Sequence, residues 1–173
     1  MSSVAAPTQA EFHEAIAKRS DTWYSACLRI TRDFDLAEDA VQDALLNAWH
    51  KRNQYERSAR LDTWIHRIAV NAALQLLRKR RPDAWDALDT DIQDHTETPD
   101  TARADQELNT SLTAALQELS EKERVCFVLK HLEQWRLKEI AEELDTSISS
   151  TKQALFRAVK KLRVSMASLR SVG

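Results

Sequence analysis

The residues of this chain with the greatest capacity for chemistry are basic and polar side chains near its C-terminus. From Ser150 to Arg170 there are six basic residues and no acidic one. Lysine donates hydrogen bonds to guanine, glutamine pairs with adenine, an exposed phenylalanine contacts a thymine methyl group, and arginine and lysine hold phosphates. These residue types suit contacts with nucleic acid. The candidate contact residues are Ser149, Ser150, Lys152, Gln153, Phe156, Arg157, Lys160, Lys161 and Arg163.

A second basic stretch lies in the first half of the chain and is followed by an acidic one. From Arg60 to Arg81 there are six basic residues and one acidic residue, whereas positions 83–107 carry nine acidic residues and one basic residue. The whole chain holds 25 lysines and arginines against 27 aspartates and glutamates, so its net charge of −2 by itself indicates no nucleic-acid partner. The distribution of the charges does indicate such a partner, because a basic surface attracts phosphate and an acidic stretch repels or mimics it.

Catalytic, metal and cofactor sites find little support in the composition. The single glycine stands at position 173, which excludes glycine-rich phosphate loops and the dinucleotide fingerprint. The five histidines are scattered, and Cys27 and Cys126 lie far apart, so neither type has metal-ligand spacing. Each cysteine sits in an apolar run and is predicted to be a small buried hydrophobe. Asp39 and Asp43 lie one helical turn apart, where a solvated helix face is a better interpretation than a catalytic pair. We therefore expect no enzyme, no metal and no cofactor.

The sequence also predicts where the protein works. No stretch of about 18 apolar residues is present, so no membrane span is expected. The first ten residues, MSSVAAPTQA, lack a basic region followed by an apolar one, which predicts no secretory signal. We expect a cytoplasmic protein.

Capping signals predict two helices at the start of the chain. Thr8 and Glu11 form a capping box, and Asp35 with Glu38 repeats its pattern. Ser20–Asp21 is a candidate break in the first helix. The core sides of these two helices are predicted to consist of Phe12, Ile16, Trp23, Ala26, Cys27, Ile30, Val41, Leu45, Ala48 and Trp49.

A third helix is predicted from about 62 to 80, because its apolar residues repeat with helical spacing and Pro82 must end it. The polar stretch 51–60 before it lacks this periodicity and is predicted to be a loop. The apolar stripe of the third helix consists of Trp64, Ile65, Ile68, Ala72 and Leu76.

The second half is also predicted to be helical and to end in a helix-turn-helix motif. Ser120 and Glu123 form a further capping box. Within 136–163, a short helix ends at Leu144, a turn of about four residues follows, and a longer basic helix begins near Ser149. In this motif the second helix lies in the major groove of DNA, with its first residues on the base edges. For the last helix taken alone, a solvated amphipathic helix is the alternative.

Together these signals predict an all-α chain with two small helical domains, at 1–82 and 108–173. Residues 83–107 between them are predicted to form an acidic flexible linker, with a short helical turn around Trp85 and Leu88 as its one candidate for regular structure. No strand pattern and no internal repeat is visible in the sequence.

Three segments carry a resemblance to a known family. EDAVQDALLNAWH at 38–50 and LDTWIHRIAVNAALQLLRKRR at 61–81 resemble region 2 of extracytoplasmic-function (ECF) sigma factors, the small bacterial initiation factors of RNA polymerase. LQELSEKERVCFVLKHLEQWRLKEIAEELDTSISSTKQALFRAVKKLR at 116–163 resembles their region 4. The order and spacing of the segments match over nearly the whole chain outside its first ten residues and the predicted linker.

The resemblance implies a role for each group of residues. The helix at 38–49 would dock on the clamp helices of the largest polymerase subunit through Asp39, Gln42, Asp43 and Asn47. The loop at 55–61 would capture a flipped-out base of the −10 promoter element, and the following helix would track the DNA backbone. The implied −10 contacts are Tyr55, Arg57, Ser58, Arg60, Arg67, Asn71, Arg78, Lys79 and Arg80. The implied −35 contacts are Ser149, Ser150, Lys152, Gln153, Phe156, Arg157 and Lys160.

Some of these residues have a second, structural interpretation. Trp64 is placed to stack on a base, but its position on the apolar stripe favours core packing. Asn71 offers a donor and an acceptor for a flipped base, and its alternative is a satisfied polar residue at a helix–helix contact. The basic run at 78–81 also suits an ordinary helix C-terminus.

The chain departs from the family at four positions. Arg57 and Asp145 stand where glycine is common, and Asp145 is expected to tolerate a left-handed conformation. Arg136 stands where serine or threonine caps a helix, so this helix start should be weaker. Ala154 replaces a commonly basic residue, which would remove a phosphate contact.

The expected function is that of a transcription initiation factor. Its partners would be core RNA polymerase, promoter DNA and an anti-sigma factor able to hold it near the membrane, with no membrane insertion and no small-molecule substrate. Two other classes stay open: a stand-alone helix-turn-helix regulator that binds a palindrome as a dimer, and, least supported, an enzyme. Stable binding to core polymerase separates the first class from the other two.

Overall fold

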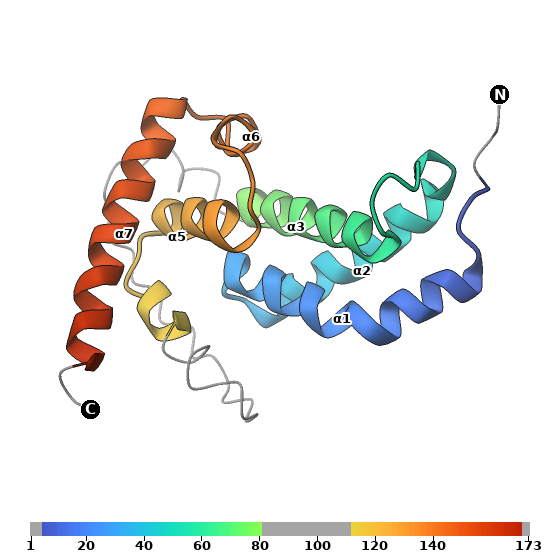
Figure 1. Ribbon diagram of the computed structural model, residues 1–173, viewed down its shortest axis with the longest axis horizontal. Coiled ribbons are helices and arrows are strands. Elements are labelled where there is room, and N and C mark those ends of the chain that lie inside the picture. The colour runs from blue at the N-terminus through green and yellow to red at the C-terminus, as the bar shows by residue number, and fades with distance from the viewer. Residues whose placement is uncertain (1–4, 81–111, 171–173) are drawn as a thin grey trace. The chain divides into compact units, whose positions relative to one another are not determined.

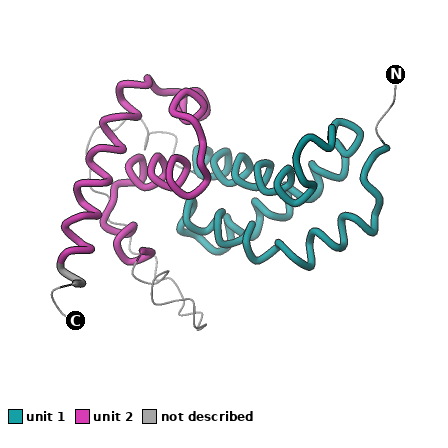
Figure 2. The backbone as a smooth tube through the Cα atoms, viewed as in Figure 1, with its two compact units in different colours: residues 1–81 teal, residues 82–173 magenta. Residues whose placement is uncertain are grey.

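The computed structural model describes residues 5–80 and 112–170, with side chains as far as 167. All regular structure in these residues is helical, which confirms the all-α prediction. The chain divides into two compact units, 1–81 and 82–173 (Figure 2). The predicted linker at 83–107, including the turn proposed around Trp85 and Leu88, lies outside the described residues.

Unit 1 is a bundle of three helices that pack pairwise against one another (Figure 1). These are α1 (Gln9–Thr31), α2 (Phe34–His50) and α3 (Leu61–Arg80). The apolar periodicity of α1 and α3 creates the core between them. Its largest fully buried members are Trp23, Ile30, Ile65, Val70 and Leu74.

The predicted break at Ser20–Asp21 is wrong, because α1 is one continuous helix. Contacts with the first turn of α3 hold both sides of the expected break. The Trp23 indole N–H donates to the backbone carbonyl of Asp62 at 3.2 Å, and Arg19 Nε donates to the Asp62 carboxylate at 3.3 Å. Tertiary contacts here outweigh the weak helix propensity of serine and aspartate.

The predicted core side and N-cap of α2 both require correction. The buried residues are Ala37, Ala40, Ala44 and Ala48, whereas Val41, Leu45 and Trp49 are half-buried. Alanine side chains permit a short distance between packed helices, which places α2 close to both neighbours. The N-cap is Asp33 rather than Asp35, because the Asp33 carboxylate accepts from the Leu36 N–H at 3.0 Å. The same carboxylate pairs with Arg80 of α3.

Unit 2 contains α5 (Glu121–Phe127), a π-helical turn (Val128–Leu132), α6 (Leu137–Glu143) and α7 (Ile148–Arg170), with residues 112–116 also helical. α5 and α6 each pack on α7 (Figure 1). The buried side of α7 is made by Thr151, Ala154, Ala158 and Leu162, while Leu155 and Val159 are half-buried. Ala154 is fully buried, and the loss of a phosphate contact at this position stays a prediction.

The turn between α6 and α7 gives the helix-turn-helix its shape. Asp145 adopts the left-handed conformation with φ 52°, as expected from the tolerance of aspartate. The Thr146 N–H bonds to the Ala141 carbonyl and the Asp145 N–H to the Glu142 carbonyl, which together close a Schellman motif. Ser147 then caps α7 by accepting from Ser150 N–H at 3.0 Å. The basic helix therefore begins at Ile148, one residue before the predicted start.

The start of α6 is as weakly capped as the sequence suggests. Arg136 occupies the N-cap position and has no oxygen in its side chain to accept a hydrogen bond. Only the reverse half of a capping box forms, in which Glu139 accepts from the Arg136 N–H at 3.2 Å. Burial of Ile140 and Ala141 supplies the contacts that hold the helix in place.

Candidate nucleic-acid and protein interfaces

The outward side of α7 gathers most of the residues predicted to read duplex DNA. They recur at helical spacing opposite the buried side of the helix, so they share a face. Phe156 is 71% exposed in the middle of this face, so its ring is accessible to a thymine methyl group. The exposed members are Ser149, Lys152, Gln153, Phe156, Lys160 and Arg163. The remaining predicted members are half-buried: Ser150, Arg157 and Lys161.

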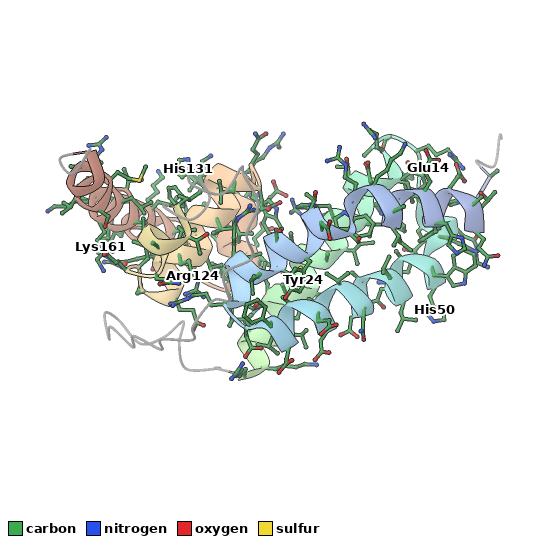
Figure 3. The ribbon with its side chains drawn as sticks, turned by 90° about the horizontal axis from the view of Figure 1, so that it is seen from below. Glu14, Tyr24, His50, Arg124, His131 and Lys161 are labelled. Carbon is green, nitrogen blue, oxygen red and sulfur yellow. The ribbon has the colours of Figure 1, made fainter. Side chains whose placement is uncertain are left out.

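Those half-buried cations are held by a buried carboxylate, Glu123, which is only 2% exposed. Its Oε2 accepts from Arg157 Nε at 3.2 Å, and its Oε1 accepts from Lys161 Nζ at 2.8 Å. Oε1 also accepts from the Ser120 N–H at 3.0 Å, as part of the predicted capping box. Figure 3 shows Lys161 on α7. The first turn of α5 therefore fixes two basic side chains of α7.

The ionisation of Glu123 follows from this geometry. Burial opposes the charged form, but hydrogen bonds from Lys161, the Ser120 N–H and Arg157 outweigh it, so the pKa of Glu123 is lowered. The carboxylate stays charged at neutral pH and remains a strong acceptor for both cations. The sequence marks Glu123 as a capping residue but does not show this second role, because Arg157 and Lys161 lie far along the chain.

Lys122 makes a parallel connection next to Glu123. Its Nζ donates to Ser150 Oγ in the first turn of α7 and to Thr146 Oγ1 at 3.4 Å in the preceding turn. Ser150 is thus engaged inside unit 2, while its neighbour Ser149 is exposed. Two consecutive residues of α5 therefore set the position of α7.

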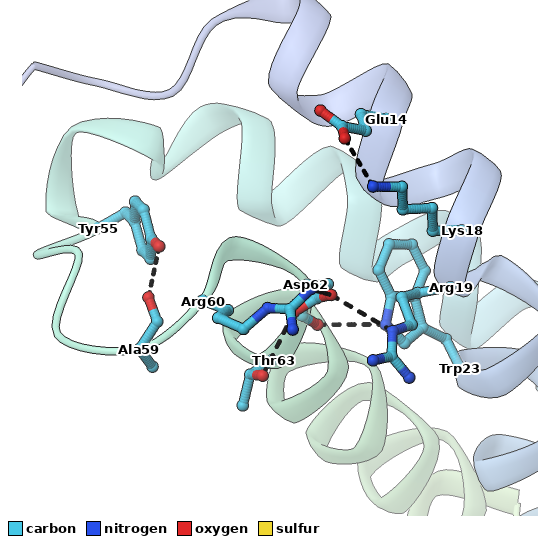
Figure 4. A network of polar contacts seen from close by, with 9 residues as sticks. All are labelled: Glu14, Lys18, Arg19, Trp23, Tyr55, Ala59, Arg60, Asp62 and Thr63. Carbon is cyan, nitrogen blue, oxygen red and sulfur yellow. Dashed lines mark hydrogen bonds and ion pairs between the residues drawn. The ribbon is translucent and has the colours of Figure 1, made fainter.

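The loop between α2 and α3 carries the predicted −10 contacts, and the structure places Tyr55 inside it. Tyr55 is 7% exposed, and its hydroxyl donates to the Ala59 carbonyl (Figure 4). Its ring centre lies 5.2 Å from that of Trp64. The polar and apolar atoms of Tyr55 are thus both used to close the loop, and its contact with DNA stays a prediction. Trp64 is half-buried against it, which favours the packing interpretation.

Arg57, at the tip of this loop, has the left-handed φ of 58° that glycine would adopt freely. Its Nη1 and Nη2 donate to Glu11 Oε1 and Oε2 at 3.1 and 3.2 Å, and its Nε donates to the Ala5 carbonyl at 3.3 Å. The bond from Arg57 lowers the pKa of Glu11, and Glu11 in turn raises the pKa of Arg57. This predicted −10 DNA contact is thus already paired with a carboxylate of α1.

Asp62 forms a second anchor where the loop enters α3. Its carboxylate accepts from Arg60 Nη2 at 3.1 Å and from Arg19 Nε at 3.3 Å (Figure 4). Most of the Arg60 side chain nevertheless faces solvent, and Ser58 is exposed as well. These two residues remain available to a ligand of the loop.

The predicted DNA-tracking residues of α3 are not equally accessible. Asn71 is half-buried, and its neighbours in the sequence, Val70 and Ala72, are buried. Arg67 and Arg78 are also half-buried. Lys79 is exposed.

Arg80 pairs with Asp33 and so ties the end of α3 to the start of α2. Burial opposes ionisation of Asp33, but bonds from the Leu36 N–H and Arg80 outweigh it and lower the pKa of Asp33. Arg80 therefore has a structural use in addition to its predicted one.

The outward face of α2 has the opposite charge. Its predicted members Asp39, Gln42, Asp43 and Asn47 are all exposed. Leu46, which sequence analysis did not single out, is 61% exposed among them. Acidic side chains repel phosphate, and an exposed leucine gains from burial in a protein interface, so this face suits a protein partner rather than DNA.

The described parts of the chain meet the requirements of neither a metal site nor a membrane span. Within residues 5–80 and 112–170, no group of three histidine, cysteine, aspartate or glutamate side chains is placed to hold a metal ion. None of the helices in these ranges is both long and apolar enough to span a bilayer. Cys27 and Cys126 are buried free thiols, as predicted, and burial raises the pKa of Cys126 to about 12.

The fold and the basic face of α7 define a helix-turn-helix protein with a separate three-helix unit. Family models divide the chain in the same order: sigma-70 region 2 matches residues 16–82, and sigma-70 region 4 matches residues 109–162. The chain belongs to the ECF family of RNA polymerase sigma factors.

Two curated relatives and a solved structure illustrate the similarity. The chain is 31% identical over 161 residues to the ECF RNA polymerase sigma factor SigG of Mycobacterium tuberculosis, a match that covers 79% of this chain but 44% of SigG. It is 30% identical over 156 residues to the RNA polymerase sigma factor CarQ of Myxococcus xanthus, covering 90% of this chain and 88% of CarQ. The chain therefore spans less than half the length of SigG and most of CarQ.

The solved structure is that of the sigma factor RpoE in complex with the anti-sigma factor NepR from Bartonella quintana. The similarity has a TM-score of 0.57 at 21% sequence identity, and it covers 91% of this chain and 97% of the matched chain. This similarity supports the fold.

Proposed function

We propose that this protein is an alternative sigma factor that binds core RNA polymerase, directs it to specific promoters and helps to melt the −10 region. The observation that carries the proposal is the pairing of two opposite surfaces in a chain of this family. One is the acidic face of α2 with its exposed Leu46, and the other is the basic face of α7 with its exposed Phe156. The catalytic step of transcription belongs to the polymerase.

The acidic face supplies the protein contact. We assign residues 1–82 to polymerase binding and −10 recognition, with Asp39, Gln42, Asp43 and Asn47 as the residues that meet the clamp helices of the largest subunit. Their exposure on one helix face supports this assignment. Leu46 adds an apolar contact that would be desolvated on binding.

The loop at 55–60 and α3 supply the −10 contacts. Melting requires bases to be unstacked at a cost of a few kcal/mol each, which the protein offsets by holding an extruded base. Ser58, Arg60 and Asn71 are the polar groups we assign to this task, with Arg67, Arg78 and Lys79 on the DNA backbone. Asn71→Ala is expected to slow promoter opening more than formation of the closed complex. Equal loss of both steps would identify Asn71 as a structural residue.

Residues 108–173 supply the −35 contacts through α7. Lys152, Gln153 and Phe156 lie on the exposed face near the first turns of the recognition helix, where this motif places its base contacts. Lys160 lies about one turn beyond Phe156 and is assigned to the phosphates. Ser149 is exposed at the start of the helix and is assigned to the same duplex.

We further propose that an anti-sigma factor controls the protein in the bacterial cytoplasm. The support is the family membership and the likeness to a sigma factor whose structure was solved with an anti-sigma factor. Such a partner would cover the same acidic and basic faces until a signal releases them.

Co-elution of the purified protein with bacterial core RNA polymerase tests the proposal. The wild-type protein is expected to bind, and the Asp39→Ala/Asp43→Ala variant is expected to lose binding while keeping its thermal stability. Run-off transcription from genomic fragments then identifies the promoter. No binding by wild-type protein freed of any co-purified inhibitor would contradict the proposal and favour a stand-alone helix-turn-helix regulator.

A further inference from the structure

The loop at 55–60 is held to the beginning of α1 by a group of contacts that centre on Arg57. The Arg57 guanidinium pairs with both oxygens of Glu11 at 3.1 and 3.2 Å. Its Nε donates to the Ala5 carbonyl at 3.3 Å, and its central carbon lies 5.7 Å from the Tyr55 ring centre. One side chain therefore connects the loop tip, the tyrosine inside the loop and the chain that leads into α1.

The backbone at Arg57 needs this support. A non-glycine residue with positive φ is uncommon, because its Cβ approaches the carbonyl oxygen. Arg57 has a φ of 58°, so the loop conformation is not one that its sequence alone favours. The bond from the Tyr55 hydroxyl to the Ala59 carbonyl closes the loop from within (Figure 4), and the Glu11–Arg57 pair holds it from outside.

Glu11 itself is held firmly in place. Its Oε2 accepts from the Thr8 N–H at 2.7 Å, and the Glu11 N–H donates to Thr8 Oγ1 at 3.2 Å, completing a capping box. The carboxylate is thus oriented by α1 before it meets Arg57. Planar pairing of a guanidinium with both carboxylate oxygens also fixes the direction of the arginine.

We propose that Glu11 is a positioning residue for the −10 loop, and that it acts through Arg57. The pair holds residues 55–60 in the conformation that receives an unpaired base, so Glu11 belongs to the −10 reading unit. Arg57 consequently serves as a strut rather than as a phosphate ligand. This inference rests on the proposed function, because it assigns a base to the loop.

The competing role for Arg57 makes different predictions. If Arg57 left Glu11 to hold a DNA phosphate, Glu11 would compete with DNA and its removal would help binding. Loss of a phosphate contact also reduces the salt dependence of binding by about one unit of slope. If Arg57 instead supports the loop, removing Glu11 does not improve DNA binding, and removing Arg57 does not reduce the salt dependence.

The first experiment measures the loop itself by hydrogen–deuterium exchange of the full-length protein. Glu11→Gln keeps the capping box, since glutamine also accepts from the N-cap N–H, but it removes the charge that pairs with Arg57. We expect amide exchange at 55–60 to rise about threefold, the size expected for an exposed ion pair. Thr8→Ala weakens the cap and keeps the pair, and Glu14→Gln removes a carboxylate one turn away that binds only Lys18 among the contacts described for it. Both are expected to leave exchange at 55–60 unchanged.

The second experiment measures promoter opening with core polymerase on a genomic fragment selected by run-off transcription. Permanganate reactivity of unpaired thymines gives the opening rate at several salt concentrations. Glu11→Gln and Arg57→Gln are each expected to slow opening about threefold, and the double variant to be no slower than either. The salt slope is expected to equal that of the wild type in all three.

Three results would overturn the inference. Faster or unchanged opening by Glu11→Gln, together with a smaller salt slope for Arg57→Gln, would make Arg57 a phosphate ligand. An increase in loop exchange in Thr8→Ala equal to that in Glu11→Gln would assign the effect to helix capping. If the wild type neither binds core polymerase nor opens a promoter, the proposed function fails, and the role of the loop fails with it. The exchange data then still show whether the Glu11–Arg57 pair holds the loop at 55–60.

Discussion

The two units use the same local device in different surroundings. In unit 1, Thr8 and Glu11 form a capping box whose glutamate pairs with Arg57; in unit 2, Ser120 and Glu123 form one whose glutamate pairs with Arg157. Each arginine belongs to an element that we assign to DNA. The carboxylates differ in burial, since the side chain of Glu11 is 38% exposed and that of Glu123 is 2% exposed.

The difference shows what burial adds to an ion pair. An exposed pair competes with water and salt, so it can select a loop conformation without contributing much to folding. A buried carboxylate must keep its partners, because an unpaired buried charge is strongly unfavourable. Unit 2 is therefore expected to depend on Glu123 for its fold, whereas unit 1 is expected to depend on Glu11 only for the shape of one loop.

The largest effect is expected from Glu123→Ala. This change removes a cap and leaves Arg157 and Lys161 without their buried partner, at a cost of about 3 kcal/mol in the free energy of unfolding. Urea denaturation followed by amide exchange in α7 measures it. Glu118→Ala, which removes an exposed carboxylate of the same unit, is the control and is expected to change stability by less than about 0.5 kcal/mol. Similar small losses in both variants would show that burial does not distinguish Glu123.

The pH dependence of unit 2 is expected to follow the same carboxylate. The folded pKa of Glu123 is lowered from its ordinary value of 4.5, so its stabilising contribution is present above that value and is lost as the pH falls through the folded pKa. Wild type and Glu123→Gln should therefore differ most near neutral pH and converge in acid. Unfolding of both proteins between pH 3 and 7 measures this, and a constant difference would contradict the linkage.

Substitutions on α7 separate reading of DNA from support of the fold. Lys152 is exposed, so Lys152→Ala is expected to weaken binding to a −35 duplex by about 1–3 kcal/mol with no change in melting temperature. Arg157→Ala is expected to weaken binding and also to lower the melting temperature, because Arg157 is a partner of Glu123. Duplex affinity and thermal melting measured side by side test this, and full binding by both variants would refute the recognition-helix assignment.

The smallest effects are expected at the two cap residues. Ser120→Ala should cost about 1 kcal/mol of unfolding free energy, since Glu123 keeps Arg157 and Lys161. Thr8→Ala should cost less, because Thr8 is exposed and its backbone N–H still donates to Glu11 in the variant. Chemical denaturation of the two single variants measures both losses of unfolding free energy. A larger loss for Thr8→Ala would contradict the expectation that unit 2 depends more on its capping box than unit 1 does.

Prediction from the sequence was most accurate where the signal was short in range. The Thr8–Glu11 and Ser120–Glu123 capping boxes and the left-handed Asp145 are all found as expected. It was less accurate where more than one side of a helix could be buried and the packing of neighbouring helices decided between them. The alanine face of α2 replaced the larger side chains as its buried side, because close helix approach outweighed apolar area.

The predicted −10 contacts show the same division. The sequence correctly placed a loop around 55–60 and the basic residues beside it. It could not show that Tyr55 turns inward to Ala59, or that Arg57 is paired with Glu11. Residue type identifies what a side chain is able to bind, whereas its surroundings decide what it does bind.

The sequence by itself determined that the chain is helical, where the Thr8–Glu11 and Ser120–Glu123 capping boxes lie and which family it resembles, because helical periodicity and capping depend on residues three or four positions apart. The tertiary structure alone decided the partners of the two capping glutamates. Arg57 is 46 positions from Glu11, and Arg157 is 34 positions from Glu123. Contacts over such distances form only when packing offsets the entropy lost in bringing the segments together. The same packing buries the carboxylate of Glu123 and leaves that of Glu11 exposed.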